Sequence, residues 1–270
     1  MTADDALVAA DDVAAAAALD ANFAELIRWY ASRPGGEVVE ADDVTACSTG
    51  LAFRSVNCAV AIDLDPANAD ERIAEVGGWF ETRGLPWRWL VGPTSRPLDL
   101  DERLVRAGFE PLSRGSVGMA LDLHGFEAEA PPAGVEIVTV DDVAGLDAWE
   151  TLQRSALALD DTQTRAWRHA HDRAVSPDVP LRDWIAFLDG VPVAAAALFV
   201  GAGVAGIYNV ATVPEARGRG IGRAITAAAL AEAVRRGQRT AVLGASEMGY
   251  PVYRRLGFRD VSRMRSYARP

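Results

Sequence analysis

The sequence predicts an α+β protein made of two domains in tandem. Three observations lead to this prediction. Strand-like apolar runs alternate with helix-like segments, a charged segment with two prolines divides the chain at residues 127–133, and the second half contains a glycine-rich turn between a strand and a helix. At 270 residues, the chain is long enough for two domains of ordinary size. We therefore expect domains at residues 1–126 and 134–270, joined by the linker.

The first half is expected to contain a strand at residues 59–66, a helix at residues 70–83 and a closing turn at Gly108-Phe109. The same order of strand, helix and Gly-Phe turn recurs in the second half, which indicates an internal duplication. An unrelated α/β domain that ends in a common Gly-Phe turn is the alternative.

The linker at 127–133 suits a boundary because its prolines stiffen the backbone and remove hydrogen-bond donors. After it we expect a strand at residues 135–140 and a helix at 141–159, where Trp149, Leu152 and Ala156 recur at helical spacing. Residues 160–162 begin a loop or a second helix.

The remaining elements follow one another closely. Strands at 184–188 and 193–200 are expected to form a hairpin, because Asp189-Gly190 favours a tight turn. Beyond the hairpin, the pattern predicts a strand at 206–213, the glycine turn, a helix at 224–236, a strand at 240–244, a short helix and a last strand at 258–267.

The glycine turn has the composition of an anion site. A strand that enters a helix through glycines leaves unpaired N–H groups beside a positive helix dipole, which favours a pyrophosphate. Side chains at positions 220 and 222 would hold a phosphate away from these groups. The turn consists of Arg217, Gly218, Arg219, Gly220, Ile221, Gly222 and Arg223.

Two common phosphate motifs are excluded by their spacing. A Rossmann fingerprint, counted from Gly218 or Gly220, would require glycine where Arg223 or Ile225 stands. A P-loop requires lysine, which the chain lacks. The pattern that remains is R-x-x-G-x-G.

This pattern, together with the preceding segment 207–214, resembles the fourth strand and turn of the GCN5-related N-acetyltransferase (GNAT) family. The segment 246–258 resembles the fifth strand, the helix after it and the closing Y-x-x-x-G-F turn of that family. The resemblance is clearest over residues 184–260 and extends over 134–270. It implies two acyl-CoA N-acyltransferase-like domains in three layers, each a mixed, mostly antiparallel twisted sheet flanked by helices.

The resemblance also implies that acetyl-CoA is the co-substrate and that the glycine turn holds its pyrophosphate. Main-chain groups of Val210, Ala211 and Thr212 would pair with the pantetheine arm where the fourth and fifth strands separate. Ser246 is a further cofactor-binding candidate, although asparagine is common there in the family.

Tyr253 matches the family tyrosine that meets the sulfur of coenzyme A, and its ordinary pKa near 10 keeps it protonated as a general acid. Tyr250 is the alternative donor. The candidates for a general base are Asp160, Asp161, Glu247 or a chain of waters.

Other polar residues give weaker indications. Tyr208 and Asn209 are expected on opposite faces of their strand, so that only one reaches the acceptor cleft. The three histidines, His124, His169 and His171, show no metal-ligand spacing, and no metal is predicted.

The first half resembles a degenerate copy of the same domain. It has no R-x-x-G-x-G after its strand, and Leu104 stands where the second half has Tyr253. We expect it to support the second domain without binding cofactor.

Charge and composition restrict the partners. The net charge is −11, and residues 1–130 contain 23 acidic residues against 10 arginines. This balance argues against nucleic-acid or membrane binding and favours cationic acceptors. The chain has no 18-residue apolar run, and its acidic start, residues 1–5, lacks a basic signal-peptide region, which predicts a cytoplasmic protein. Cys47 and Cys58 are expected to be buried free thiols.

The predicted function is N-acetyl transfer from acetyl-CoA to a primary amine of a small molecule or peptide, by direct attack in a ternary complex. A non-catalytic acetyl-CoA-binding or sensing module that acts through a partner protein is the alternative. A homodimer is possible, and the acceptor amine is not identified by the sequence.

Overall fold

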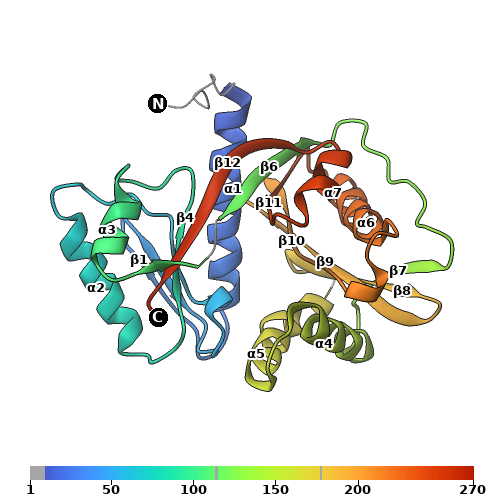
Figure 1. Cartoon of the computed structure of the whole chain (residues 1–270), viewed down its shortest axis with the longest axis horizontal. Coiled ribbons are helices and arrows are strands. Elements are labelled where there is room, and N and C mark those ends of the chain that lie inside the picture. The colour runs from blue at the N-terminus through green and yellow to red at the C-terminus, as the bar shows by residue number, and fades with distance from the viewer. Residues whose placement is uncertain (1–9, 113–114, 177) are drawn as a thin grey trace.

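The computed structural model describes residues 10–112, 115–176 and 178–270 (Figure 1); the acidic start at residues 1–5 lies outside them. The first half begins with a long helix that the sequence patterns did not predict, α1 (Ala10–Ala31), in which alanine is the commonest residue. The elements that follow are β1 (Glu37–Glu40), β2 (Thr45–Ser48), η1 (Arg54–Val56), β3 (Cys58–Val60), α2 (Ala69–Glu81), β4 (Arg88–Val91), α3 (Leu100–Arg106), β5 (Glu110–Pro111) and β6 (Ser116–Asp122).

The second half follows the predicted order closely, including a second helix after residue 160. Its elements are β7 (Val135–Thr139), α4 (Val143–Leu157), α5 (Asp161–His171), η2 (Asp172–Val175), β8 (Leu181–Leu188), β9 (Val191–Gly201), β10 (Val204–Thr212), η3 (Pro214–Ala216), α6 (Ile221–Arg235), β11 (Thr240–Ala245), α7 (Tyr250–Arg255) and β12 (Arg259–Ala268).

The described strands form one sheet that runs through both halves, in the order β1-β2-β3-β4-β12-β6-β11-β10-β9-β8-β7, with β5 beside β12. The pairs β3–β4 and β10–β11 are parallel, and the other described pairs are antiparallel. The predicted α+β class with a mixed, mostly antiparallel sheet is therefore confirmed.

The two halves exchange strands where they meet. Strand β6 precedes the predicted linker, yet it lies between β11 and β12, which follow it. Strand β12 pairs with β6 through residues 259–264 and then with β4 through residues 265–267. The boundary at 127–133 stays a prediction, and the sheet itself is continuous across it.

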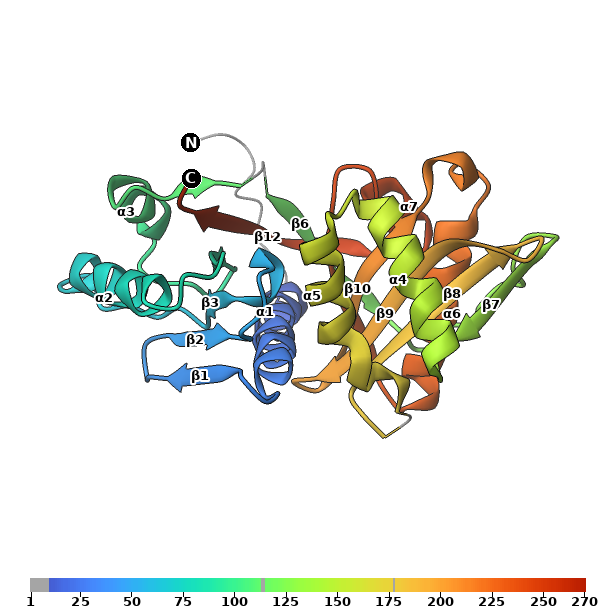
Figure 2. The ribbon, with the colours of Figure 1, turned by 90° about the horizontal axis from the view of Figure 1, so that it is seen from below.

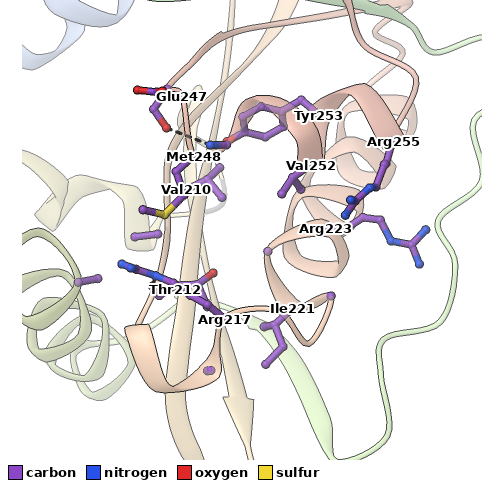
Figure 3. Close-up of a pocket in the computed structure, with 18 of the residues that line it drawn as sticks. Val210, Thr212, Arg217, Ile221, Arg223, Glu247, Met248, Val252, Tyr253 and Arg255 are labelled. Carbon is purple, nitrogen blue, oxygen red and sulfur yellow. Dashed lines mark hydrogen bonds between the residues drawn. The ribbon is translucent and has the colours of Figure 1, made fainter. Parts of the chain in front are cut away.

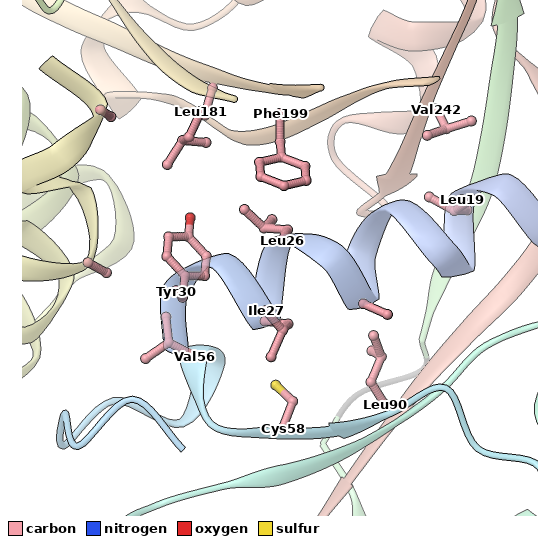
Figure 4. Packing of buried hydrophobic residues seen from close by; sticks show 14 of the residues in the cluster. Leu19, Leu26, Ile27, Tyr30, Val56, Cys58, Leu90, Leu181, Phe199 and Val242 are labelled. Atoms are coloured by element: carbon pink, nitrogen blue, oxygen red, sulfur yellow. The ribbon is translucent and has the colours of Figure 1, made fainter. Parts of the chain in front are cut away.

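Helices cover both faces of the second half. α4, α5 and α1 lie on one face, and α6 lies on the other (Figure 2). α1 belongs to the first half but packs on β9, β10 and β11 as well as on β2. Its apolar side chains Leu19, Leu26 and Ile27 are buried between the two halves (Figure 4). A helix shared in this way holds the halves in one fixed arrangement.

In the first half, the segments that follow the two parallel strands β3 and β4 stay hydrogen-bonded to each other. The predicted strand at 59–66 ends at Val60, because Ala61 takes a left-handed φ of +51°. The N–H of Arg96 then bonds the carbonyl of Ile62 at 2.9 Å, and the N–H of Leu64 bonds the carbonyl of Arg96 at 3.2 Å. The two segments thus remain linked beyond β3, whereas in the second half the pairing of β10 with β11 ends at Ile207.

Both cysteines are free and buried in the first half. Within the described ranges, no helix has the length and apolar character needed to cross a membrane.

Candidate active site

The glycine turn adopts the backbone that its sequence requires. Gly218 and Gly220 have φ values of +76° and +78°, a region that side-chain-bearing residues rarely enter. Gly220 is the N-cap of α6 and has no side chain to occupy the first N–H groups. A Cβ at Gly222 would lie 3.3 Å from Oγ1 of Thr212, so the turn packs closely on the end of β10.

The first turn of α6 leaves donors available. The helical bonds begin with the N–H of Ala224, which donates to the carbonyl of Gly220 at 3.0 Å. The N–H groups of residues 221–223 therefore have no place in the helical ladder. Together with the positive end of the helix dipole, they form a setting that attracts an anion.

Strands β10 and β11 separate beside this turn. They pair only over residues 205–207 and 241–243, although β10 continues to Thr212 and β11 to Ala245. A bulge interrupts the pairing of β10 with β9 between Tyr208 and Ala211, and Asn209 has a φ of +54°. The separation leaves the β11-facing edge of residues 208–212 free of strand pairing.

A cleft of about 860 Å³ opens between the separated strands, the glycine turn and α7 (Figure 3). Tyr253 and all the predicted cofactor-binding residues except Arg219 line it. The complete lining is Ala156, Leu157, Val210, Ala211, Thr212, Ala216, Arg217, Gly218, Gly220, Ile221, Gly222, Arg223, Ser246, Glu247, Met248, Gly249, Val252, Tyr253 and Arg255.

Some of the lining was missed by the sequence analysis. Gly249 and Val252 share the helical spacing of Tyr253, and this spacing is a signal that could have identified them. Ala156 and Leu157 lie at the end of α4, far away in the sequence, and no local pattern marks them as cleft residues.

Tyr253 extends from α7 toward Val210 and Met248 (Figure 3). Its side chain is 7% exposed, and burial raises its pKa to about 12. Among the described residues, none forms a hydrogen bond with its hydroxyl. The hydroxyl of Tyr250, in contrast, donates to Oδ2 of Asp260 at 3.0 Å. The two tyrosines therefore differ in whether the hydroxyl is available.

Ser246 has a structural contact at the start of α7. Its Oγ accepts a hydrogen bond from the N–H of Gly249 at 3.2 Å, directly before the helix. Gly249 in turn lies against the ring of Tyr253, since a Cβ at this position would come within 2.9 Å of Cε2. The hydrogen bond from Gly249 to Ser246 fixes the turn directly before α7, the helix that carries Tyr253.

Arginines surround the glycine turn. Nε of Arg217 donates to the carbonyl of Thr212 at 3.0 Å, which ties the turn to β10. Arg223 forms a 2.6 Å ion pair with Glu129 of the predicted linker. Arg255 lies at the cleft with no ion pair among the described residues.

The three carboxylate candidates for a general base are placed differently. Asp160 caps α5, where its side chain accepts from the N–H of Gln163 at 2.8 Å. Asp161 forms an ion pair with Arg154. Glu247 alone of the three lines the cleft.

The expected alternation of Tyr208 and Asn209 is wrong. The Tyr208 hydroxyl donates to Oδ1 of Asn22 on α1 at 2.6 Å, and Nδ2 of Asn209 lies 3.3 Å from Nε2 of His171 on α5. Both side chains thus point to the face that α1 and α5 cover. The bulge inserts an extra residue at this point, and strict alternation fails there.

Residues 146–258, in the second half of the chain, match the acetyltransferase (GNAT) family. No curated protein matches the chain. Within the described residues, no group of three or more histidine, cysteine or acidic side chains is arranged to hold a metal.

Solved structures match nearly the whole chain. A GCN5-related N-acetyltransferase from Kribbella flavida is 22% identical, with a TM-score of 0.73 and 95% of each chain covered. One from Sphaerobacter thermophilus is 18% identical, with a TM-score of 0.65, 98% of this chain and 95% of that chain covered. A tandem GNAT protein from the clavulanic acid biosynthesis pathway is 18% identical, with a TM-score of 0.60 and coverage of 97% and 96%. The chain therefore has the fold of tandem GNAT proteins.

Proposed function

We propose that this chain, whose second half belongs to the acetyltransferase (GNAT) family, transfers an acetyl group from acetyl-CoA to a primary amine of a small molecule or peptide. The observation that carries the proposal is the cleft in which three features meet: an edge of β10 without strand pairing, a helix start without a side-chain cap, and the Tyr253 hydroxyl, which has no hydrogen-bond partner among the described residues. Each of these three features supplies something that acyl transfer from a thioester requires.

The helix start would bind the pyrophosphate of acetyl-CoA. The N–H groups of residues 221–223 can donate to its oxygens, and Gly218 and Gly220 allow the backbone to approach closely. Arg217, Arg219 and Arg223 on the turn would add positive charge. Arg255 at the cleft would contribute in the same way, since no acidic partner in the described chain neutralises it.

The free edge of β10 would bind the pantetheine arm. Main-chain groups of Val210, Ala211 and Thr212 line the cleft where pairing with β11 has ended. An N–H at this edge would donate to the thioester oxygen, an interaction of order 3 kcal/mol in acyl-transfer enzymes.

Tyr253 would donate the proton that the departing thiolate takes up. Because burial raises its pKa to about 12, the phenol stays protonated at neutral pH. The attack would be direct, since Cys47 and Cys58 lie buried in the first half and burial raises the pKa of Cys47 to about 12. Glu247, the carboxylate that lines the cleft, is the candidate base.

A panel of primary amines incubated with acetyl-CoA and the full chain tests the proposal. We expect release of free coenzyme A thiol with at least one amine, cationic amines being favoured by the acidic first half. Calorimetric binding of acetyl-CoA without turnover of any amine would support the non-catalytic sensing module instead. Absence of binding would refute both functions.

A further inference from the structure

A buried polar network joins the two halves of the chain at His171, the last residue of α5. Nδ1 of His171 lies 2.7 Å from Oδ2 of Asp183 on β8, and its Nε2 lies 3.0 Å from the Tyr30 hydroxyl on α1. In Figure 4 the Tyr30 hydroxyl points from α1 toward the strands of the second half. The imidazole packs against the rings of Trp149 and Trp167, with centroids 4.4 Å away in both cases.

The chemistry of the partners sets the direction of these bonds. A carboxylate only accepts, so Nδ1 of His171 carries the proton that is donated to Asp183. Nε2 then has one lone pair, which accepts from the Tyr30 hydroxyl at 3.0 Å, and Nδ2 of Asn209 lies 3.3 Å from the same nitrogen. Burial, reinforced by the charge of Asp183, holds the pKa of Tyr30 well above its ordinary value, so its hydroxyl remains a donor.

Asn209 is held at both its side chain and its main chain. Its amide group contacts His171, and its carbonyl accepts from Nε2 of Gln153 on α4 at 3.3 Å. Its φ of +54° is uncommon for a residue with a side chain, although asparagine tolerates it better than most. The next residue, Val210, lines the cofactor cleft. These contacts therefore hold the bulge from the face of the sheet opposite the one on which the glycine turn and α6 lie.

The residue before the bulge is held by the same helix of the first half. Asn22 on α1 donates from Nδ2 to the carbonyls of Gly201 and Val204 at 2.8 and 3.2 Å. Its Oδ1 accepts from the Tyr208 hydroxyl at 2.6 Å. Both Asn22 and Tyr30 are buried, so α1 fixes this stretch of β10 at two points.

The network contains buried polar atoms that do not contribute to the stability of the core. Oδ1 of Asp183 and Oε1 of Gln153 are buried and have no hydrogen-bond partner among the described residues. Buried acceptors without partners destabilise a fold, and apolar side chains of similar shape avoid that cost. A role in holding a particular backbone geometry explains why these groups stand here.

We propose that Tyr30, His171, Asp183 and Gln153 are positioning residues that hold Asn209 in its bulged conformation, so that β10 presents a fixed main-chain edge to the thioester end of acetyl-CoA. This rests on the proposed function and deepens it. It also gives the first half a defined task, because Tyr30 reaches the network from α1. The glycine turn, which binds the other end of the cofactor, has no contact with these residues among the hydrogen bonds of the described chain.

Binding of two ligands to three variants tests the proposal. Tyr30→Phe removes one hydroxyl, Asn209→Gly removes the side chain but permits the positive φ, and Asn209→Ala removes the side chain and disfavours that φ. Calorimetry would measure acetyl-CoA and ADP, which carries a diphosphate without the pantetheine arm. We expect Kd for acetyl-CoA to rise roughly three- to tenfold, most in Asn209→Ala, the range expected for one hydrogen bond. Kd for ADP should stay unchanged.

Tyr267→Phe is the matched control, because this buried tyrosine lies in the core of the first half, away from the network. Wild-type affinities for both ligands in all three variants would overturn the positioning role. Equal weakening of both ligands, together with a lower melting temperature, would also overturn it and indicate a purely structural network. If the unmodified chain does not bind acetyl-CoA, the proposed function itself fails, and the positioning role fails with it.

Discussion

The hydroxyl of Tyr250 donates to Oδ2 of Asp260 at 3.0 Å, which ties the first residue of α7 to β12. Tyr253, three residues later, faces the cleft and has no such partner among the described residues. Sequence alone left both tyrosines as candidate acids. The hydrogen bond to Asp260 makes the Tyr250 phenol a structural group and leaves Tyr253 as the available donor.

We expect Tyr253→Phe to lower kcat by about 100-fold, the effect typical of losing a general acid. Kd for acetyl-CoA should be nearly unchanged, because the proton is needed only when the thiolate departs. Steady-state kinetics and calorimetry would measure the two quantities. Tyr250→Phe is the control and should keep most of the activity. A loss of affinity in Tyr253→Phe equal to its loss of kcat would remove this residue from the acid role.

The alkaline side of the pH profile should be flat. Burial raises the pKa of Tyr253 to about 12, and the acid is active while it is protonated, so its contribution is lost only as pH rises through that value. We expect kcat at saturating substrate to show no decline from about pH 8 to about pH 10. A decline centred near the ordinary tyrosine value of about 10 would contradict the assignment.

Alanine substitutions at the two glycines that flank α6 can distinguish an effect on cofactor binding from an effect on stability. Gly220 precedes the helix and Gly237 follows it, with φ values of +78° and +77° and no close neighbour for an added Cβ. Alanine at either position should lower the free energy of unfolding by about 1 kcal/mol, the cost of a left-handed backbone. Only Gly220→Ala should weaken acetyl-CoA binding. Denaturant unfolding and calorimetry check both, and equal affinities in the two variants would argue against the turn as a pyrophosphate site.

The ion pair between Glu129 and Arg223 should compete with the cofactor. Arg223 lowers the pKa of Glu129, so this carboxylate is charged at neutral pH and occupies a guanidinium at the edge of the cleft. We expect Glu129→Gln to tighten acetyl-CoA binding by roughly two- to fivefold at low salt, as exposed pairs contribute little, and the gain to vanish at high salt. Arg223→Gln should weaken binding. Tighter binding that persists at high salt would rule out this explanation.

The elements of the second half could be predicted because their signals are local. The turn at Asp189-Gly190 and the glycine turn at 217–223 define where neighbouring strands and helices begin, whatever the rest of the chain does. The position of Tyr253 on a short helix followed by Gly257-Phe258 is also a local pattern. Placement of these residues around one cleft followed from the family resemblance.

The network around His171 could not be predicted in this way. Tyr30 and His171 are 141 residues apart, and the sequence around His171 shows no metal-ligand spacing or other motif that would mark it. Nor could the sequence show that the bulge at Asn209 turns two consecutive side chains to one face. These features depend on α1, α4 and α5 packing on the same face of the sheet.

By itself, the sequence determined the class of fold, the order of elements in the second half and the shape of the glycine turn, because glycine conformations, helix starts and strand periodicity are properties of neighbouring residues. Only the tertiary structure decided that β6 and β12 cross between the halves, that Arg96 bonds to Ile62 and Leu64 in the first half, and that Tyr30 reaches His171 beside the bulge of β10. Those outcomes arise from contacts between segments that are distant in the sequence. The free energy of such a contact depends on how the two surfaces fit together, so it cannot be inferred from either segment alone.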